Sequence, residues 1–214
     1  GVELDIQLSK DGEIVVCHDE MVDRTSNAKG WLKDYTLAEL KAMDFSYQFK
    51  ELGKVSIPTM KEVFELLKPT NLIINIELKT GIFDYEGIEE KIIALTHAEG
   101  FEDRVIYSSF NHYSIMKIQE LDPNAKTAFL YSDGPLDMPL YGYEHHVNAL
   151  HPAAYNLRLP DFMEECNVYH LDVNVWTVNT EEIALMCLKY GVNTLITNYP
   201  DRIKKVIEQY ETGI

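Results

Sequence analysis

From residue 2 to residue 8 the chain alternates strictly between apolar and polar side chains, with Glu3, Asp5 and Gln7 at the polar positions. An alternation with period two is typical of a strand. Successive side chains of a strand point to opposite faces, so Glu3 and Asp5 share one face. Two carboxylates that close repel each other unless a cation neutralises them. Taken alone, the segment fits an exposed edge strand with a polar outer face equally well.

Beyond residue 70 the chain alternates between short apolar runs and segments with apolar residues at helical spacing. Strand starts recur at intervals of roughly 20 to 30 residues, which predicts a parallel sheet with helices between the strands. The aromatic-rich segment 141–143 is expected to form a loop that packs against the core. Seven parallel strands are predicted, starting near residues 2, 72, 104, 127, 147, 173 and 194, whereas a closed barrel of this kind needs eight.

The region 19–56 interrupts this alternation. Turn-forming residues are concentrated in 23–30. Thr36 followed by Glu39 is the pattern of a capping box, so a short helix is expected there, and another helix is expected to start at Thr59. We therefore predict a single domain over 1–214 in which 19–56 is a small insertion or lid.

Composition and charge narrow the classes of function. Nineteen Lys and Arg against 35 Asp and Glu give a net charge of −16, which argues against a nucleic-acid partner. There is no run of about 18 apolar residues, so no transmembrane segment is expected. Three widely spaced cysteines indicate free buried thiols in a reducing compartment, and hence a cytoplasmic protein. No pattern indicates an oligomeric state.

A third carboxylate is expected to join the first two. By the same alternation Asn75, Glu77 and Lys79 share one face of their strand. In parallel barrels the chemistry lies at the carboxyl ends of the strands, where Glu77 would meet Glu3 and Asp5. Three carboxylates without His or Cys describe a site for Ca²⁺ or Mg²⁺ rather than Zn²⁺. Lys79 is able to hold an anion such as phosphate, although a Glu77–Lys79 pair by itself is more often a surface salt bridge.

Several short motifs, in order and in register from residue 1 to about residue 210, resemble the glycerophosphodiester phosphodiesterase family. They are Glu3-Leu4-Asp5, His18-Asp19-Glu20, Asp23-Arg24-Thr25, Ile57-Pro58-Thr59, Ile76-Glu77-Leu78-Lys79, Ser109-Phe110, Trp176-Thr177-Val178-Asn179 and Thr197-Asn198-Tyr199-Pro200.

The resemblance implies a TIM barrel with a small insertion after its second strand. It implies hydrolysis of a small-molecule glycerophosphodiester to glycerol 3-phosphate and an alcohol, in lipid and glycerol metabolism. The family's metal ligands match Glu3, Asp5 and Glu77, and its acid/base histidine matches His18. Its phosphate-side lysine matches Lys79, and the aromatic residue of its glycerol pocket matches Trp176.

The chain departs from the family pattern at its start. The family opens with a strand ending in His-Arg, which this sequence lacks, so a second catalytic histidine and a phosphate-binding arginine are missing. We therefore expect the first βα unit to lie upstream of Gly1 in the natural protein, and this chain to be inactive without it. Asn198 stands where many members carry Asp.

Two other functions remain open at this point. One is an enolase-like barrel that uses a metal and Lys79 as a base on a carboxylic acid, a chemistry that does not need the His18-Asp19-Glu20 motif. The other is a barrel that binds phosphodiesters without catalysis, which the missing His-Arg pair favours. His151 closes a predicted strand, and the pattern leaves open whether it touches a ligand or supports the structure.

Overall fold

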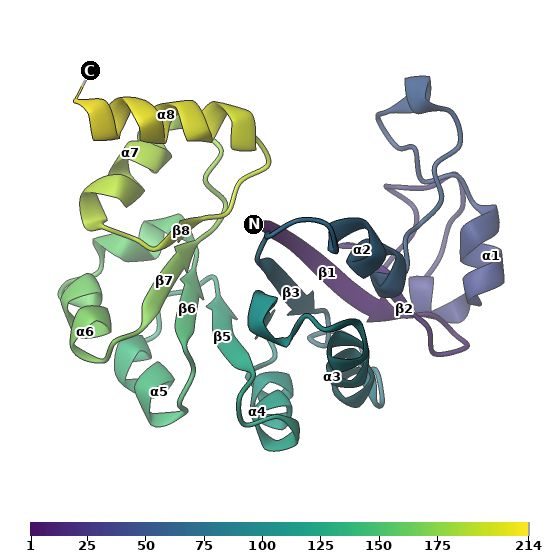
Figure 1. The fold of residues 1–214 in the computed structure, drawn as a ribbon, viewed down its shortest axis with the longest axis horizontal. Coiled ribbons are helices and arrows are strands. Elements are labelled where there is room, and N and C mark those ends of the chain that lie inside the picture. Colours follow the sequence, from purple (N-terminus) through teal and green to yellow (C-terminus); the bar gives the residue numbers. More distant parts are fainter. Residues whose placement is uncertain (214) are drawn as a thin grey trace. The chain divides into compact units, whose positions relative to one another are not determined.

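The computed structural model describes residues 1–213, which form two compact units, Gly1–Ala125 and a second that begins at Lys126. Within each unit parallel strands alternate with helices, as the sequence pattern predicts (Figure 1). All seven predicted parallel strands are present. They are β1 Val2–Leu8, β3 Ile74–Leu78, β4 Val105–Ser109, β5 Lys126–Tyr131, β6 Ala149–Pro152, β7 Asp172–Val175 and β8 Thr194–Leu195.

The sheet of the first unit has the strand order β2-β1-β3-β4. β1 pairs in parallel with β3, and β3 with β4, while the short β2 (Ile14–Val16) runs antiparallel to β1. The register sets Asp5 opposite Glu77. The other face of β3 carries Ile74 and Ile76, both fully buried. The sheet therefore has an apolar face and a face with acidic residues near its carboxyl end.

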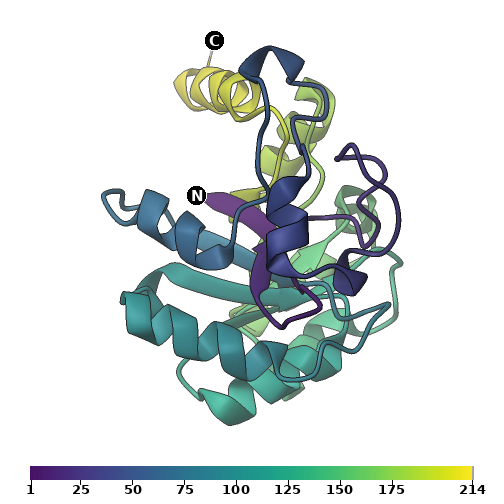
Figure 2. The same cartoon turned by 90° about the vertical axis from the view of Figure 1, so that its right-hand side faces the viewer.

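Two long helices of the first unit, α3 (Ile88–Glu99) and α4 (His112–Leu121), lie side by side (Figure 2). The ammonium of Lys117 on α4 lies 3.2 Å from the carboxylate of Glu89 on α3. The helices provide the connections that parallel strands require, because such strands cannot be joined by a tight turn.

Local sequence decides where the first two α-helices of the chain begin. The Thr36 hydroxyl accepts a hydrogen bond from the Glu39 backbone N–H at the start of α1 (Leu37–Ala42), and the Glu39 carboxylate accepts one from the Thr36 N–H. Thr59 and Glu62 repeat this arrangement at α2 (Met60–Leu67). Both predicted helix starts are confirmed, because a capping box satisfies N–H groups that lack a partner within the helix.

The insertion 19–56 packs around a small apolar core that it shares with the residues beside it. Val22, Leu32 and Leu40 of the insertion are buried there together with Ile57 and with Val15 of β2. In Figure 1 the helix α1 of this region lies beyond the carboxyl end of β1. The insertion therefore stands beside the edge of the sheet where the acidic residues are, and its role as a lid stays a prediction.

The second unit has the strand order β5-β6-β7-β8, all parallel. Val173 and Val175 on β7 are fully buried, and the Thr180 hydroxyl accepts from the Ile183 N–H where α7 begins. Its helices are α5 Met138–Glu144, α6 Phe162–Val168, α7 Glu181–Tyr190 and α8 Pro200–Thr212.

The expectation of a loop at 141–143 is wrong, because these residues belong to α5. Gly142 lies against the core so closely that a Cβ there would be 3.0 Å from a Leu150 methyl group and 3.3 Å from one of Leu171. Tyr141 stacks on Phe129 with ring centroids 5.1 Å apart. Tertiary packing thus stabilises a helix at a glycine that costs helix stability locally.

Two expectations from composition can be compared with the structure. The three cysteines are buried and free, as predicted. None of the helices formed by residues 1–213 combines the length and the apolar character that a bilayer crossing needs.

Candidate active site

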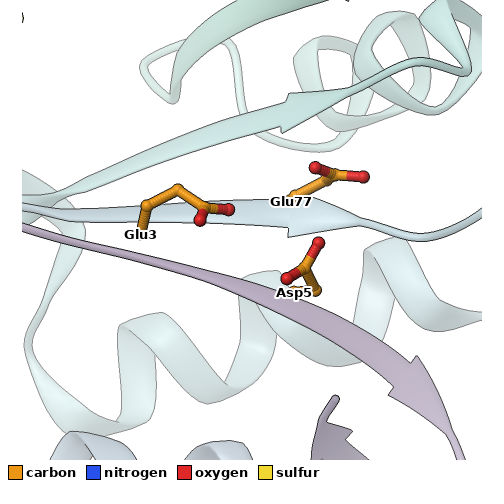
Figure 3. A group of neighbouring side chains, drawn as sticks. All are labelled: Glu3, Asp5 and Glu77. Atoms are coloured by element: carbon orange, nitrogen blue, oxygen red, sulfur yellow. The ribbon is translucent and has the colours of Figure 1, made fainter. Parts of the chain in front are cut away.

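Three carboxylates converge at the acidic face of the first unit (Figure 3). Glu3 and Asp5 extend from β1, and Glu77 extends from β3 directly opposite Asp5. One carboxylate oxygen of each residue lies within 4.8 Å of those of the other two. The period-two alternation of both strands and the parallel register produce this cluster, as the sequence predicts.

The cluster holds more negative charge than the protein alone neutralises. Asp5 and Glu77 are 9% and 8% exposed, and Glu3 keeps more contact with solvent. Loss of water around Glu3, together with the charges of Asp5 and Glu77, raises its pKa from 4.5 to about 8. Burial and the Asp5 charge also raise the pKa of Glu77. Carboxylates with raised pKa values indicate a site that favours a bound cation.

Among residues 1–213, Lys79 is the lysine whose ammonium forms ion pairs with these carboxylates. Its Nζ lies 3.1 Å from a Glu77 oxygen and 3.6 Å from Asp5 Oδ1. Burial lowers the pKa of Lys79, but the charges of Glu77 and Asp5 outweigh this and raise it overall. With a side chain only 12% exposed, Lys79 forms a buried ion pair rather than the surface salt bridge that its sequence alone suggested.

The donor set fits a hard divalent cation. All three ligands are carboxylates, which Ca²⁺ and Mg²⁺ prefer. Asp5 Oδ1 is buried and accepts no hydrogen bond within the described chain, although a buried polar atom normally has a partner. A cation bound by Glu3, Asp5 and Glu77 would satisfy this oxygen and offset the excess charge.

His18 lies two residues beyond the end of β2, with 65% of its side chain exposed. Its Nδ1 is 2.7 Å from Asp19 Oδ1. The Asp19 carboxylate also accepts from Arg24, at 2.6 Å from Nε and 2.8 Å from Nη2, and these bonds lower the pKa of Asp19 to about 2. An ionised Asp19 keeps a proton on Nδ1, which makes Nε2 of the neutral ring the acceptor nitrogen.

His18 is close enough to the carboxylates to interact with them. A positive charge on its ring would offset part of the rise in the Glu77 pKa that burial and Asp5 cause. The segment that carries it is bonded to β1, since the Cys17 N–H donates to the Asp5 carbonyl at 3.0 Å. The structure thus brings together Glu3, Asp5, Glu77, Lys79 and His18.

Trp176 belongs to the second unit, one residue after β7 ends. Its indole N–H donates to the His151 carbonyl at 2.8 Å. The His151 ring is fully buried, its Nε2 is 2.8 Å from the Asn174 amide nitrogen, and burial lowers its pKa to about 3. His151 is therefore neutral at any ordinary pH, and together with Asn174 it supports the strand end that carries Trp176.

Three residues near this site were not selected from the sequence. Asp19 and Arg24 were visible only as parts of motifs, and their bond to the His18 ring depends on the fold of the insertion. Gln7 follows Asp5 on the same strand face and is fully buried. The period-two rule that selected Glu3 and Asp5 applies to Gln7 as well and would have selected it.

Comparisons with known proteins point to one family. A family model described as the glycerophosphoryl diester phosphodiesterase family matches residues 1–202. A protein of Caldanaerobacter subterraneus subsp. tengcongensis named glycerophosphodiester phosphodiesterase is 40% identical over 210 residues, which are 98% of this chain and 86% of that protein. A protein of Bacillus altitudinis with the same name is 40% identical over 215 residues, with the same coverage.

Solved structures match over nearly the whole chain. An Oleispira antarctica phosphodiesterase in complex with the product sn-glycerol-3-phosphate is 27% identical with a TM-score of 0.84, covering 97% of this chain and 84% of that one. A putative glycerophosphoryl diester phosphodiesterase from Agrobacterium tumefaciens is 23% identical with a TM-score of 0.88, covering 99% and 86%. The latter similarity concerns the fold alone.

Proposed function

This chain belongs to the glycerophosphoryl diester phosphodiesterase family, whose fold is the TIM barrel, and we propose that it hydrolyses glycerophosphodiesters with a divalent cation held by three carboxylates. The products are glycerol 3-phosphate and an alcohol, and the Oleispira relative was solved with that phosphate bound. Members of the family generally depend on a metal. Family membership removes the enolase-like alternative.

The observation that carries the proposal is the convergence of Glu3, Asp5 and Glu77, among them a buried Asp5 oxygen that accepts no hydrogen bond within the described chain. A bound Mg²⁺ or Ca²⁺ supplies positive charge to the phosphate oxygens, whose negative charge must be stabilised in the transition state. The three side chains extend from two paired strands, so their spacing is set by the sheet rather than by mobile loops. Such ligands are preorganised for a cation.

Lys79 binds the phosphate from the side of Glu77. Its ammonium is the counter-charge of Glu77 and Asp5 in the protein described here. With a cation held by these carboxylates, the Lys79 ammonium would be free to contact a phosphate oxygen. A point charge with three rotating donors suits this task.

His18 transfers the proton that the reaction must move, because an alkoxide is a poor leaving group. A histidine titrates near neutral pH and can both accept and donate a proton. The hydrogen bond to Asp19, itself held by Arg24, fixes the ring and leaves Nε2 as the nitrogen that exchanges the proton. Trp176 provides an apolar surface for the glycerol carbons, as an aromatic ring near a strand end is suited to do.

The proposal is tested by measuring turnover of glycerophosphocholine by the complete gene product with Mg²⁺ or Ca²⁺, with excess chelator, and in the variant Glu77→Gln. We expect chelator to abolish activity and Glu77→Gln to lower kcat by roughly 10³-fold, the scale of losing one electrostatic stabiliser. Glu65→Gln removes an exposed carboxylate on α2 and is the matched control, with unchanged activity. Full activity in excess chelator would contradict metal dependence.

A further inference from the structure

Gln7 has a polar side chain although its position is fully buried. It lies on β1 two residues after Asp5, on the same strand face, and is 0% exposed. A buried amide destabilises the fold unless its donors and acceptor are bonded. The bonds that Gln7 makes therefore show what this residue is for.

The amide nitrogen of Gln7 binds the segment that carries His18. Nε2 lies 2.8 Å from the Cys17 carbonyl oxygen and 2.9 Å from that of Asp19, with the His18 carbonyl oxygen at 3.4 Å. These consecutive carbonyls follow the end of β2 at Val16, where the sheet no longer orders the chain. Gln7 thus ties the His18 segment to the strand that carries Glu3 and Asp5.

Tyr85 determines which way the Gln7 amide points. Its hydroxyl donates to Gln7 Oε1 at 2.8 Å, and burial raises the Tyr85 pKa, which keeps the hydroxyl protonated. In the reversed orientation the amide oxygen would face three carbonyl oxygens and the amide nitrogen would face the hydroxyl. The hydrogen-bond network therefore fixes the donor toward the His18 segment.

We propose that Gln7 and Tyr85 form a clamp that positions His18 for proton transfer, an inference that rests on the acid/base role proposed for His18. Both are positioning residues and act through the Cys17–Asp19 backbone. Asp19 sets the tautomer and direction of the ring, whereas the clamp sets the distance of the whole segment from the carboxylate cluster. Loss of the clamp lowers the rate because a displacement of about 1 Å in a catalytic group costs about 10²-fold.

The test is a double-mutant cycle between Gln7→Met and His18→Ala in the complete gene product, with kcat and KM for glycerophosphocholine measured at saturating Mg²⁺. Met fills a similar volume and has no donor for the carbonyls. Gln7→Met is expected to lower kcat about 10²-fold with KM little changed, and Tyr85→Phe to lower it about tenfold. In the His18→Ala background neither change lowers kcat further, because the clamp acts only through His18.

Tyr107→Phe is the matched control. It also removes a buried tyrosine hydroxyl, bonded to Thr96 at 2.8 Å, but Tyr107 lies on the opposite face of the sheet from Glu77. We expect its thermal unfolding to change as much as that of Tyr85→Phe and its kcat to stay at the wild-type value.

The possible results separate the clamp from the function on which it rests. An equal loss of kcat from Gln7→Met with and without His18 overturns the clamp alone. Unchanged kcat in His18→Ala overturns the acid/base role of His18 and the clamp with it. If Gln7→Met does not fold, Tyr85→Phe decides. A kcat of Tyr85→Phe equal to that of Tyr107→Phe overturns the clamp. A lower kcat of Tyr85→Phe supports the clamp if the loss disappears when His18 is replaced by Ala.

Discussion

The strand ends of the two units carry polar residues of opposite character. At the ends of β1 and β3 three carboxylates face a single ammonium, and Asp5 Oδ1 has no hydrogen-bond partner in the described chain. At the ends of β6 and β7 the buried polar groups are neutral, with His151 bonded to Asn174 and its carbonyl bonded to Trp176. The first arrangement carries an excess of negative charge that a bound cation would offset, whereas the second is uncharged.

The two histidines show the same contrast. His18 is exposed to solvent, and its Nδ1 is bonded to an ionised carboxylate. His151 is fully buried with its pKa lowered to about 3, so its ring stays neutral. Burial and charge, rather than residue type, therefore decide which histidine can carry protons.

The largest expected effect separates these histidines. His18→Ala should lower kcat by about 10²–10⁴-fold, the usual contribution of an acid/base group, with little change in stability because the side chain is exposed. His151→Leu should lower the free energy of unfolding by about 1–3 kcal/mol, because Asn174 loses its buried partner, and should keep kcat per folded molecule. Steady-state kinetics and thermal unfolding of the same preparations decide, and an equal loss of kcat in both variants would contradict the distinction.

A smaller effect is expected at Trp176. If its ring packs on the glycerol carbons equally in ground state and transition state, Trp176→Ala should raise KM about tenfold and leave kcat nearly unchanged. Trp176→Phe keeps most of the apolar surface and serves as the control with a KM near the wild-type value. A loss confined to kcat would show that Trp176 acts on the reacting atoms instead.

The smallest effect concerns pH and the metal-free protein. Because the Glu3 pKa is raised from 4.5 to about 8, the folded protein binds more protons than the unfolded chain between these values. Stability in chelator should therefore fall as pH rises from about 4.5 to about 8. Added Mg²⁺ should restore it at the upper end of this range, because a ligand bound only by the folded state stabilises that state.

Glu3→Gln isolates this effect. The variant cannot ionise at residue 3, so its melting temperature in chelator should depend less on pH than that of the wild-type protein, with Glu65→Gln as the unaffected control. A melting temperature that rises steadily from pH 4.5 to 8 in the wild-type protein would contradict an excess of negative charge at the cluster.

Local patterns determined the strands, the helix starts and the composition of the candidate site. Alternation along 2–8 and 74–78 put the three carboxylates on the same face of two paired strands, because side-chain direction in a strand depends only on position. The capping box at Thr36 and the helix start at Thr59 formed as predicted, because the residues that determine them lie within one turn. Such features depend on neighbours in sequence and are therefore readable from it.

Only the tertiary structure decided the remaining features, because they depend on residues far apart in the chain. Helix α5 packs closely on the core at Gly142 because this residue has no Cβ, which lets Leu150 of β6 approach its backbone. Gln7 reaches the carbonyls of residues 17–19 and the hydroxyl of Tyr85, which is 78 residues away. The difference between the proposed proton carrier His18 and the neutral support His151 comes from burial, and burial is a property of the folded chain rather than of any local pattern.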